Sequence, residues 1–137
     1  MNRTRVIGLQ LFKYDIQGFL QWGYNFYYSQ YSLFPIDPYL CNDGCFNWVP
    51  AGDAFSVYPG PGGKPYESLH MAAFTQGLSD LRALELYASL TSKEEAVSLI
   101  ESFAGGEITF KEYPRREGFC VELRERINRA IKLKIES

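Results

Sequence analysis

The side chains best suited to chemistry in this sequence are aromatic, and most of them lie in one region. Sixteen of the 22 aromatic residues fall between Phe12 and Tyr66, where no lysine or arginine occurs between Lys13 and Lys64. A sugar stacks its C–H face on an aromatic ring, and its hydroxyl groups bond to Asn, Asp and Tyr side chains. A site without cations also does not repel an oxocarbenium-like transition state. We expect most of these rings to form a core, with Trp22, Tyr24 and Asn25 as the exceptions that favour carbohydrate binding.

Hydrolysis of a glycosidic bond needs more than aromatic rings, because most glycosidases use two carboxyl groups. The aromatic region offers single aspartates in turn contexts, such as Asp37, Asp43 and Asp53, and none of them stands next to another acid. We therefore expect no complete catalytic pair of carboxyl groups within this chain.

Cys41 and Cys45 form the most conspicuous pair of reactive residues. A metal site would need further ligands, and the remaining candidates are His70 and Cys120. Three cysteines leave one unpaired in any disulfide scheme. The main expectation is free thiols in a turn, with a metal site and a Cys41–Cys45 disulfide as alternatives. We expect no metal and no cofactor.

The segment YPGPGGK over residues 58–64 has the glycines and lysine of a phosphate-binding loop but not its spacing. That motif requires glycine where Tyr58 stands and serine or threonine where Pro65 stands. A tight turn into a helix explains the segment better. His70 is the only histidine, has no Cys or Ser partner in a nucleophile context, and is expected to pack a helix.

The elements that must position these residues follow in the order helix, strand, long loop, strand and three helices. We expect a helix over 6–14, strands over 19–24 and 54–58, an ordered loop over 25–53, and helices after Pro65, after Ser92 and around 120–131. Ser92 and Glu95 match a capping box. Trp22, Tyr24 and Asn25 stand at the end of the first strand, where parallel α/β folds carry their site.

This order is typical of the end of a parallel α/β domain, with two inner strands and outer helices. Two strands do not make a stable sheet, and a (β/α)₈ barrel needs about 250 residues. We therefore expect a missing part upstream of Met1. The chain reads as one segment, with an aromatic strand-and-loop half over 1–66 and a helical half over 67–137.

Composition and charge exclude several classes of protein. The formal net charge of −2 argues against nucleic acid as a partner. No apolar run approaches the roughly 18 residues of a membrane span. The run Val6–Phe12 is too short for a signal peptide, so a cytoplasmic location is the default expectation.

Three blocks occur in an order that resembles a known family: GFLQWGYNFYYS over 18–29, GDAFSVYPG over 52–60 and ESLHMAAFTQGLSDLRAL over 67–84. The sequence is similar to the uncharacterised C-terminal domain of bacterial proteins related to the β-N-acetylgalactosaminidases of glycoside hydrolase family 123. The similarity covers nearly the whole chain and extends through residues 123–128.

The resemblance implies that the chain is the last part of a (β/α)₈ TIM-type barrel: two inner strands, a long aromatic loop and three or more outer helices. In that family an adjacent Asp-Glu pair works by substrate assistance. This sequence has no Asp-Glu dipeptide, so the catalytic residues would lie upstream. Positions matching motifs of the sugar pocket are Trp22, Tyr24, Asn25 and Tyr58, with Trp48 as a further candidate from the loop.

One position departs from the family pattern. His70 stands where arginine is expected after Ser-Leu, which puts in question a buried ion pair with Asp80.

The expected function is that of the C-terminal part of a glycoside hydrolase-like catalytic domain acting on N-acetylhexosamine-containing glycans. The chain would contribute sugar-binding aromatic residues and would be inactive alone, with carbohydrate and the upstream part of the barrel as its partners. One alternative is a stand-alone carbohydrate-binding or interaction module. Another is an oligomer that pairs exposed sheet edges.

Overall fold

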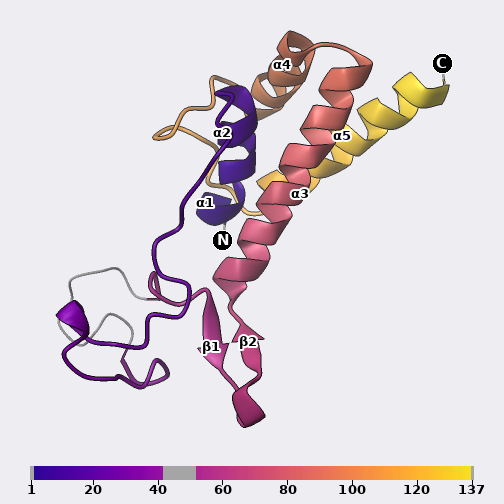
Figure 1. The fold of residues 1–137 in the computed structure, drawn as a ribbon. Coiled ribbons are helices and arrows are strands. Elements are labelled where there is room, and N and C mark those ends of the chain that lie inside the picture. Colours follow the sequence, from indigo (N-terminus) through magenta and orange to yellow (C-terminus); the bar gives the residue numbers. More distant parts are fainter. Residues whose placement is uncertain (1, 42–51, 137) are drawn as a thin grey trace. The chain divides into compact units, whose positions relative to one another are not determined.

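The computed structural model describes residues 2–41 and 52–136 (Figure 1). Its elements are α1 (Asn2–Arg5), α2 (Ile7–Lys13), the 3₁₀ turn η1 (Gln30–Ser32), β1 (Val57–Pro59), the 3₁₀ turn η2 (Pro61–Gly63), β2 (Pro65–Glu67), α3 (Leu69–Leu90), α4 (Lys93–Ala104) and α5 (Phe119–Glu136). None of the described helices is both long and apolar enough to span a membrane.

The chain divides into two compact units. Residues 1–18 and 73–137 form one, here called the helical unit, and residues 19–72 form the other, here called the aromatic unit. The first 18 residues thus belong with the C-terminal helices, whereas the sequence grouped them with the aromatic half.

The helical unit has a continuous hydrophobic core. Apolar residues three or four positions apart give α5 one buried stripe, which faces the other helices. The core consists of Val6, Leu9, Phe12, Ala83, Leu84, Tyr87, Ala96, Ile100, Ile108, Phe119, Cys120, Leu123, Ile127 and Ile131.

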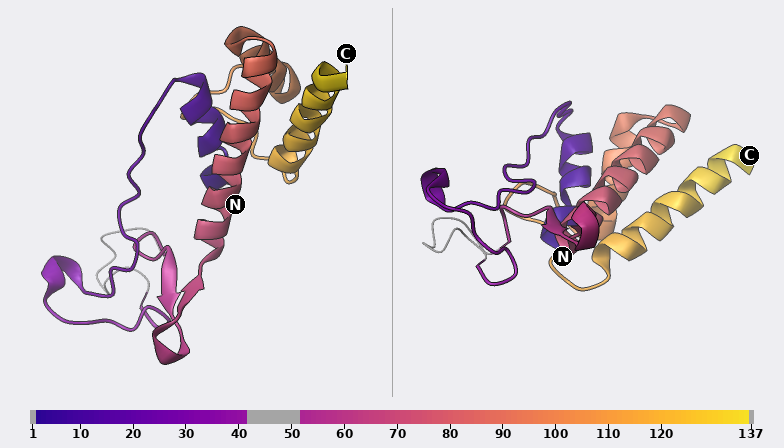
Figure 2. Two further views of the ribbon diagram at one scale, coloured as in Figure 1. Left: turned by 45° about the vertical axis from the view of Figure 1, so that its right-hand side comes forward. Right: turned by 60° about the horizontal axis from the view of Figure 1, so that its bottom comes forward.

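Two glycines allow α2 to lie directly against α3, and the two helices run side by side in Figures 1 and 2. A Cβ atom placed on Gly8 would lie 1.9 Å from the carbonyl oxygen of Gly77. A Cβ atom on Gly77 would lie 2.6 Å from the carbonyl oxygen of Arg5. Side chains at either position would push the helices apart, so the glycines set this close approach.

The start of α4 confirms the serine half of the capping box predicted from the sequence, whereas the Glu95 carboxylate accepts a hydrogen bond from the Tyr87 hydroxyl at 3.0 Å. The backbone N–H of Glu95 donates to the Ser92 hydroxyl at 3.1 Å, which satisfies one free amide of the first turn. At the other end Gly105 takes a left-handed conformation with φ 77° and stops the helix.

Asp80 is a buried charged residue of the helical unit. The family pattern has arginine at the position of His70, and its absence here put in question an ion pair between that position and Asp80. In the structure Asp80 is ion-paired with Arg5 of α1 and Arg124 of α5. The carboxylate is therefore neutralised by arginines that the family pattern did not indicate.

The predicted strand over 19–24 is wrong. Leu20 is 84% exposed, and no residue from 19 to 24 belongs to a strand. Pairing begins only at the end of this segment: the N–H of Ser56 donates to the carbonyl of Tyr24 at 2.8 Å, and Asn25 forms an isolated antiparallel bridge with Phe55. An apolar run does not form a strand without a neighbouring strand to pair with along its length.

The sheet of the described residues is an antiparallel hairpin. β1 pairs with β2 in the register Val57–Glu67, Tyr58–Tyr66 and Pro59–Pro65, around the turn η2. The strand predicted over 54–58 begins three residues early and ends one residue early, because β1 covers 57–59. The helix expected after Pro65 starts at Leu69, because residues 65–67 pair with β1. The place of the chain at the end of a (β/α)₈ barrel stays a prediction.

Candidate functional site

β1 accepts hydrogen bonds from two tyrosines of the aromatic unit. The hydroxyl of Tyr27 donates a hydrogen bond to the carbonyl of Val57 at 2.8 Å. The hydroxyl of Tyr39 donates to the carbonyl of Pro59 at 2.7 Å. Two carbonyls of one short strand therefore fix the positions of two aromatic rings.

These tyrosines belong to a connected set of rings. Phe55, which is 1% exposed, lies between Tyr27 and Tyr58, with ring centroids 5.9 and 5.6 Å away. Tyr39 packs on Tyr58, with ring centroids 5.3 Å apart. Offset and edge-on arrangements at these distances are favourable for aromatic pairs. The buried phenylalanine anchors the tyrosines of the set.

The phenol of Tyr27 is kept protonated by its surroundings. Burial raises its pKa above the usual value, and the neighbouring hydroxyls of Tyr39, Tyr24 and Tyr58 raise it further, because each would add a like charge on ionisation. The hydrogen bond from the Tyr27 hydroxyl to β1 uses this protonated form.

A hollow of about 480 Å³ opens beside β1, and we call it the aromatic hollow. It lies where β1, β2 and the first turn of α3 meet, so the hairpin and the helix start together shape it. Its walls are Tyr39, Gly52, Phe55, Tyr58, Tyr66, Glu67, Ser68, Leu69 and His70. Aromatic rings, a carboxylate and an imidazole thus share one cavity.

Several polar groups of the aromatic hollow are available to a ligand. Within residues 2–41 and 52–136, no hydrogen bond or ion pair engages the phenol of Tyr58, the carboxylate of Glu67 or the imidazole of His70. Tyr66 is 54% exposed and presents its ring to solvent. Ring faces beside free donors and acceptors are what a polyhydroxylated ligand such as a sugar requires.

The predicted site residues fall into separate groups. Tyr58 lines the aromatic hollow, whereas Trp22, Tyr24 and Asn25 do not. Trp22 packs instead on Phe26, with ring centroids 5.4 Å apart. Tyr24 and Asn25 pair through their backbones with residues next to β1. Trp48 lies outside the residues that the structure describes.

Most residues of the aromatic hollow were not among the predicted site residues. Tyr66 and Glu67 were placed in the start of a helix, and His70 was assigned to helix packing. A signal was present: Tyr58 and Tyr66 flank the turn signals Pro59, Gly60, Pro61, Gly62 and Gly63, and such a segment between two extended runs is typical of a hairpin.

The cysteine prediction needs a correction. Cys41 is disulfide-bonded, so the expectation that it is a free thiol is wrong. Cys45 lies outside the described residues. In the part of the chain that the structure describes, no group of three or more His, Cys, Asp or Glu residues could hold a metal ion.

Comparison with known families assigns the aromatic unit to a catalytic domain. The model of the glycoside hydrolase 123 catalytic domain matches residues 1–87. This match includes all residues of the aromatic hollow and ends within α3. The chain therefore belongs to glycoside hydrolase family 123. No curated protein matches the sequence.

Proposed function

We propose that the aromatic hollow is a sugar-binding site of a glycoside hydrolase-like catalytic domain that acts on N-acetylhexosamine-containing glycans. The observation that carries the proposal is the combination of tyrosine rings with unengaged polar groups in one cavity. This cavity lies in the part of the chain that matches the family's catalytic domain.

The side chains that line the hollow make different kinds of contact with a sugar. Tyr66, with its exposed ring, offers a face on which the C–H side of a sugar stacks. The Tyr58 phenol donates or accepts, and Glu67 accepts from sugar hydroxyls or from the N–H of an acetamido group. His70 adds one donor and one acceptor when neutral. The hollow thus binds and orients a sugar.

The catalytic acids of the proposed enzyme lie outside this chain. Glu67 is the one carboxylate among the described residues that line the hollow, whereas hydrolysis calls for two acidic groups around the glycosidic bond. Large apolar side chains of the aromatic unit are also exposed, among them Leu20, Leu33 and Leu40. A surface of this kind is typical of a docking face. The upstream part of a (β/α)₈ barrel would cover it and supply the acids.

The alternative function is a carbohydrate-binding module without catalysis. The same cavity favours it, because stacking and hydrogen bonding to a sugar need no acid pair. The two functions differ in one result: only the enzyme gains hydrolytic activity when the upstream part of the barrel is supplied.

Titration of the 137-residue chain with N-acetylgalactosamine, followed by NMR, tests the binding step. We expect saturable shifts, with Tyr66→Ala weakening binding about three- to tenfold, the loss of one aromatic contact. Tyr31→Ala is the matched control, because Tyr31 is an exposed tyrosine that does not line the hollow. Equal effects of the two substitutions, or no saturable shift, would contradict the proposal.

A second assay tests whether the chain alone can hydrolyse a glycosidic bond. The chain alone should release no phenol from an aryl β-N-acetylgalactosaminide. Turnover at enzyme-like rates by the pure chain would show that the acids are present here and would overturn this part of the proposal.

A further inference from the structure

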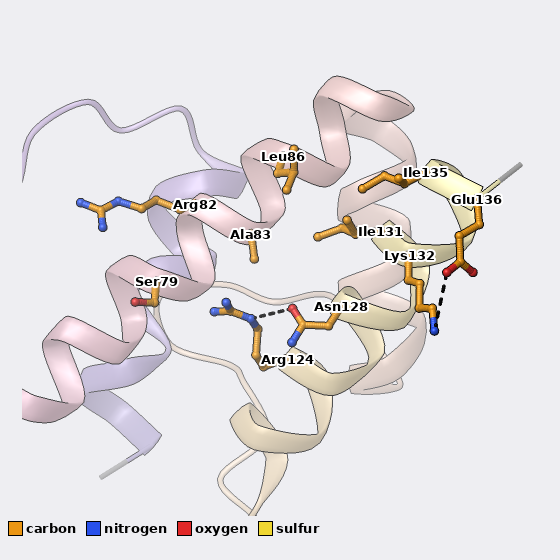
Figure 3. Close-up of a pocket in the computed structure, with 10 residues that line it drawn as sticks. All are labelled: Ser79, Arg82, Ala83, Leu86, Arg124, Asn128, Ile131, Lys132, Ile135 and Glu136. Carbon is orange, nitrogen blue, oxygen red and sulfur yellow. Dashed lines mark hydrogen bonds and ion pairs between the residues drawn. The ribbon is translucent and has the colours of Figure 1, made fainter.

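The helical unit carries a second, shallow hollow, which we call the α3–α5 groove. It has a volume of about 580 Å³ and is lined by Ser79, Arg82, Ala83, Leu86, Arg124, Asn128, Ile131, Lys132, Ile135 and Glu136. Figure 3 shows the aliphatic side chains of both helices pointing toward one another across it. Among the described residues that line it, the apolar ones are aliphatic and none is aromatic, so it does not suit a stacked sugar.

The floor of the groove becomes more exposed toward the C-terminal end of α5. Ala83 and Ile131 are buried, whereas Leu86 is 47% and Ile135 is 66% exposed. Covering these two side chains would remove apolar area from water, which favours binding at about 25 cal/mol per Å². Part of the apolar floor of the groove is therefore exposed to solvent.

The rim of the groove is positively charged, although the chain carries a net charge of −2. Arg124 shares the carboxylate of Asp80 with Arg5, so two guanidinium groups face one carboxylate. Lys132 is paired with Glu136 at 3.6 Å. Arg82 has no ion-pair partner among residues 2–41 and 52–136. Cations therefore outnumber anions around an apolar floor.

The length and shape of the groove fit a helix. Its lining on α5 runs from Arg124 to Glu136, and these residues span about 18 Å at the helical rise of 1.5 Å per residue. An α-helix of three to four turns has this length. Apolar residues spaced i, i+3, i+4 and i+7 on such a helix would meet the floor, in the helix-in-groove mode of recognition.

We propose that the α3–α5 groove binds an amphipathic helix of a partner protein whose apolar stripe is flanked by acidic residues. The apolar stripe covers Leu86 and Ile135, and the acidic flanks face Arg82 and Arg124. This binding surface is separate from the aromatic hollow, and α5 lies beyond the residues that match the catalytic domain.

A labelled 14-residue peptide with leucines at i, i+3, i+4 and i+7 and glutamates beside them is the probe. Its fluorescence anisotropy should report saturable binding to the 137-residue chain, weakened at least tenfold when lysines replace the glutamates. Added salt should weaken binding as well, because the rim contacts are exposed to solvent.

Two pairs of substitutions locate the binding surface. Leu86→Glu should weaken binding at least tenfold and Arg82→Glu about threefold or more. The matched controls are Leu133→Glu and Arg129→Glu on α5, since both residues are exposed and neither lines the groove. They should leave affinity within twofold. Circular dichroism establishes that each variant retains its helices.

Three results would overturn the proposal: no binding up to 1 mM peptide, equal binding of the lysine peptide, or equal losses in the control variants. A fourth concerns a different occupant. If the chain dimerises and Leu86→Glu abolishes the dimer, the groove binds a second copy instead of an acidic partner.

Discussion

The guanidinium group of Arg5 forms two hydrogen bonds with the carboxylate of Asp80, which lies 75 positions further along the chain. Nε meets Oδ2 at 2.7 Å and Nη2 meets Oδ1 at 3.1 Å. Arg124 adds a bond from Nη1 to Oδ1 at 3.0 Å. One carboxylate, 3% exposed, therefore joins α1, α3 and α5.

Removal of this carboxylate should destabilise the helical unit strongly. Asp80→Ala leaves Arg5 and Arg124 without their counter-charge, and an uncompensated charge of this kind costs about 3–5 kcal/mol. Urea unfolding followed by circular dichroism measures the loss. Glu122→Ala, which breaks the half-exposed pair with Arg116, should cost much less, because solvent screens that pair. Comparable losses in the two variants would contradict a central role for Asp80.

The helical part of the fold was the part that the sequence could predict. Periodic apolar residues located α5, and Ser92 with Glu95 located the start of α4, because helix signals are local in sequence. The Asp80 ion pairs were not predictable, because their partners lie 75 and 44 positions away and no local pattern links them.

The close approach of α2 and α3 should depend on glycine at position 8. Gly8→Ala places a methyl group within 1.9 Å of a backbone carbonyl, which cannot move as a flexible side chain would. Overpacking of this kind costs about 1–3 kcal/mol or more. Gly106→Ala is the matched control, because no atom lies within 4 Å of the added Cβ. Thermal unfolding should show a clear fall in midpoint for the first variant only.

The aromatic hollow was predictable only in part. Tyr58 was chosen from its motif, and it does line the cavity. Tyr66 and Glu67 were missed because a hairpin brings them to Tyr58, and hairpin pairing depends on register and on what covers each face. His70 was missed with them, because it follows β2 in the first turn of α3. The prediction of a strand over 19–24 failed for a related reason: apolar composition does not provide a neighbouring strand.

The contribution of Lys13 to stability should disappear in acid. Its ammonium group donates to Glu101 Oε1 at 2.7 Å, to Glu107 Oε1 at 2.8 Å and to the Ile108 carbonyl at 2.9 Å. The hydrogen bond from Lys13 lowers the pKa of Glu101 in the folded chain. A lowered carboxyl pKa stabilises the fold above the unfolded pKa, and the stabilisation is lost as the pH falls through the folded value.

Unfolding of the original chain and of Lys13→Met at several pH values measures this contribution. The difference in unfolding free energy should be about 1 kcal/mol and constant above about pH 6, and it should shrink from about pH 5 downward. A difference that stays the same at about pH 3 would show that packing of the lysine stem, and not its charge, is responsible.

The thiol of Cys120 should be unreactive while the helical unit is folded. Burial raises its pKa to about 11, Asp80 adds to the effect and Arg5 opposes it. The side chain belongs to the core and is 4% exposed. Because the thiolate is the reactive form, both the low thiolate fraction and the lack of access slow alkylation.

Iodoacetamide at about pH 8 should modify Cys120 at least about 100-fold more slowly in the folded chain than in guanidinium chloride. Mass spectrometry of the peptide that contains Cys120 gives both rates, and a rate ratio near one would mean that α5 separates from the core far more often than this packing allows.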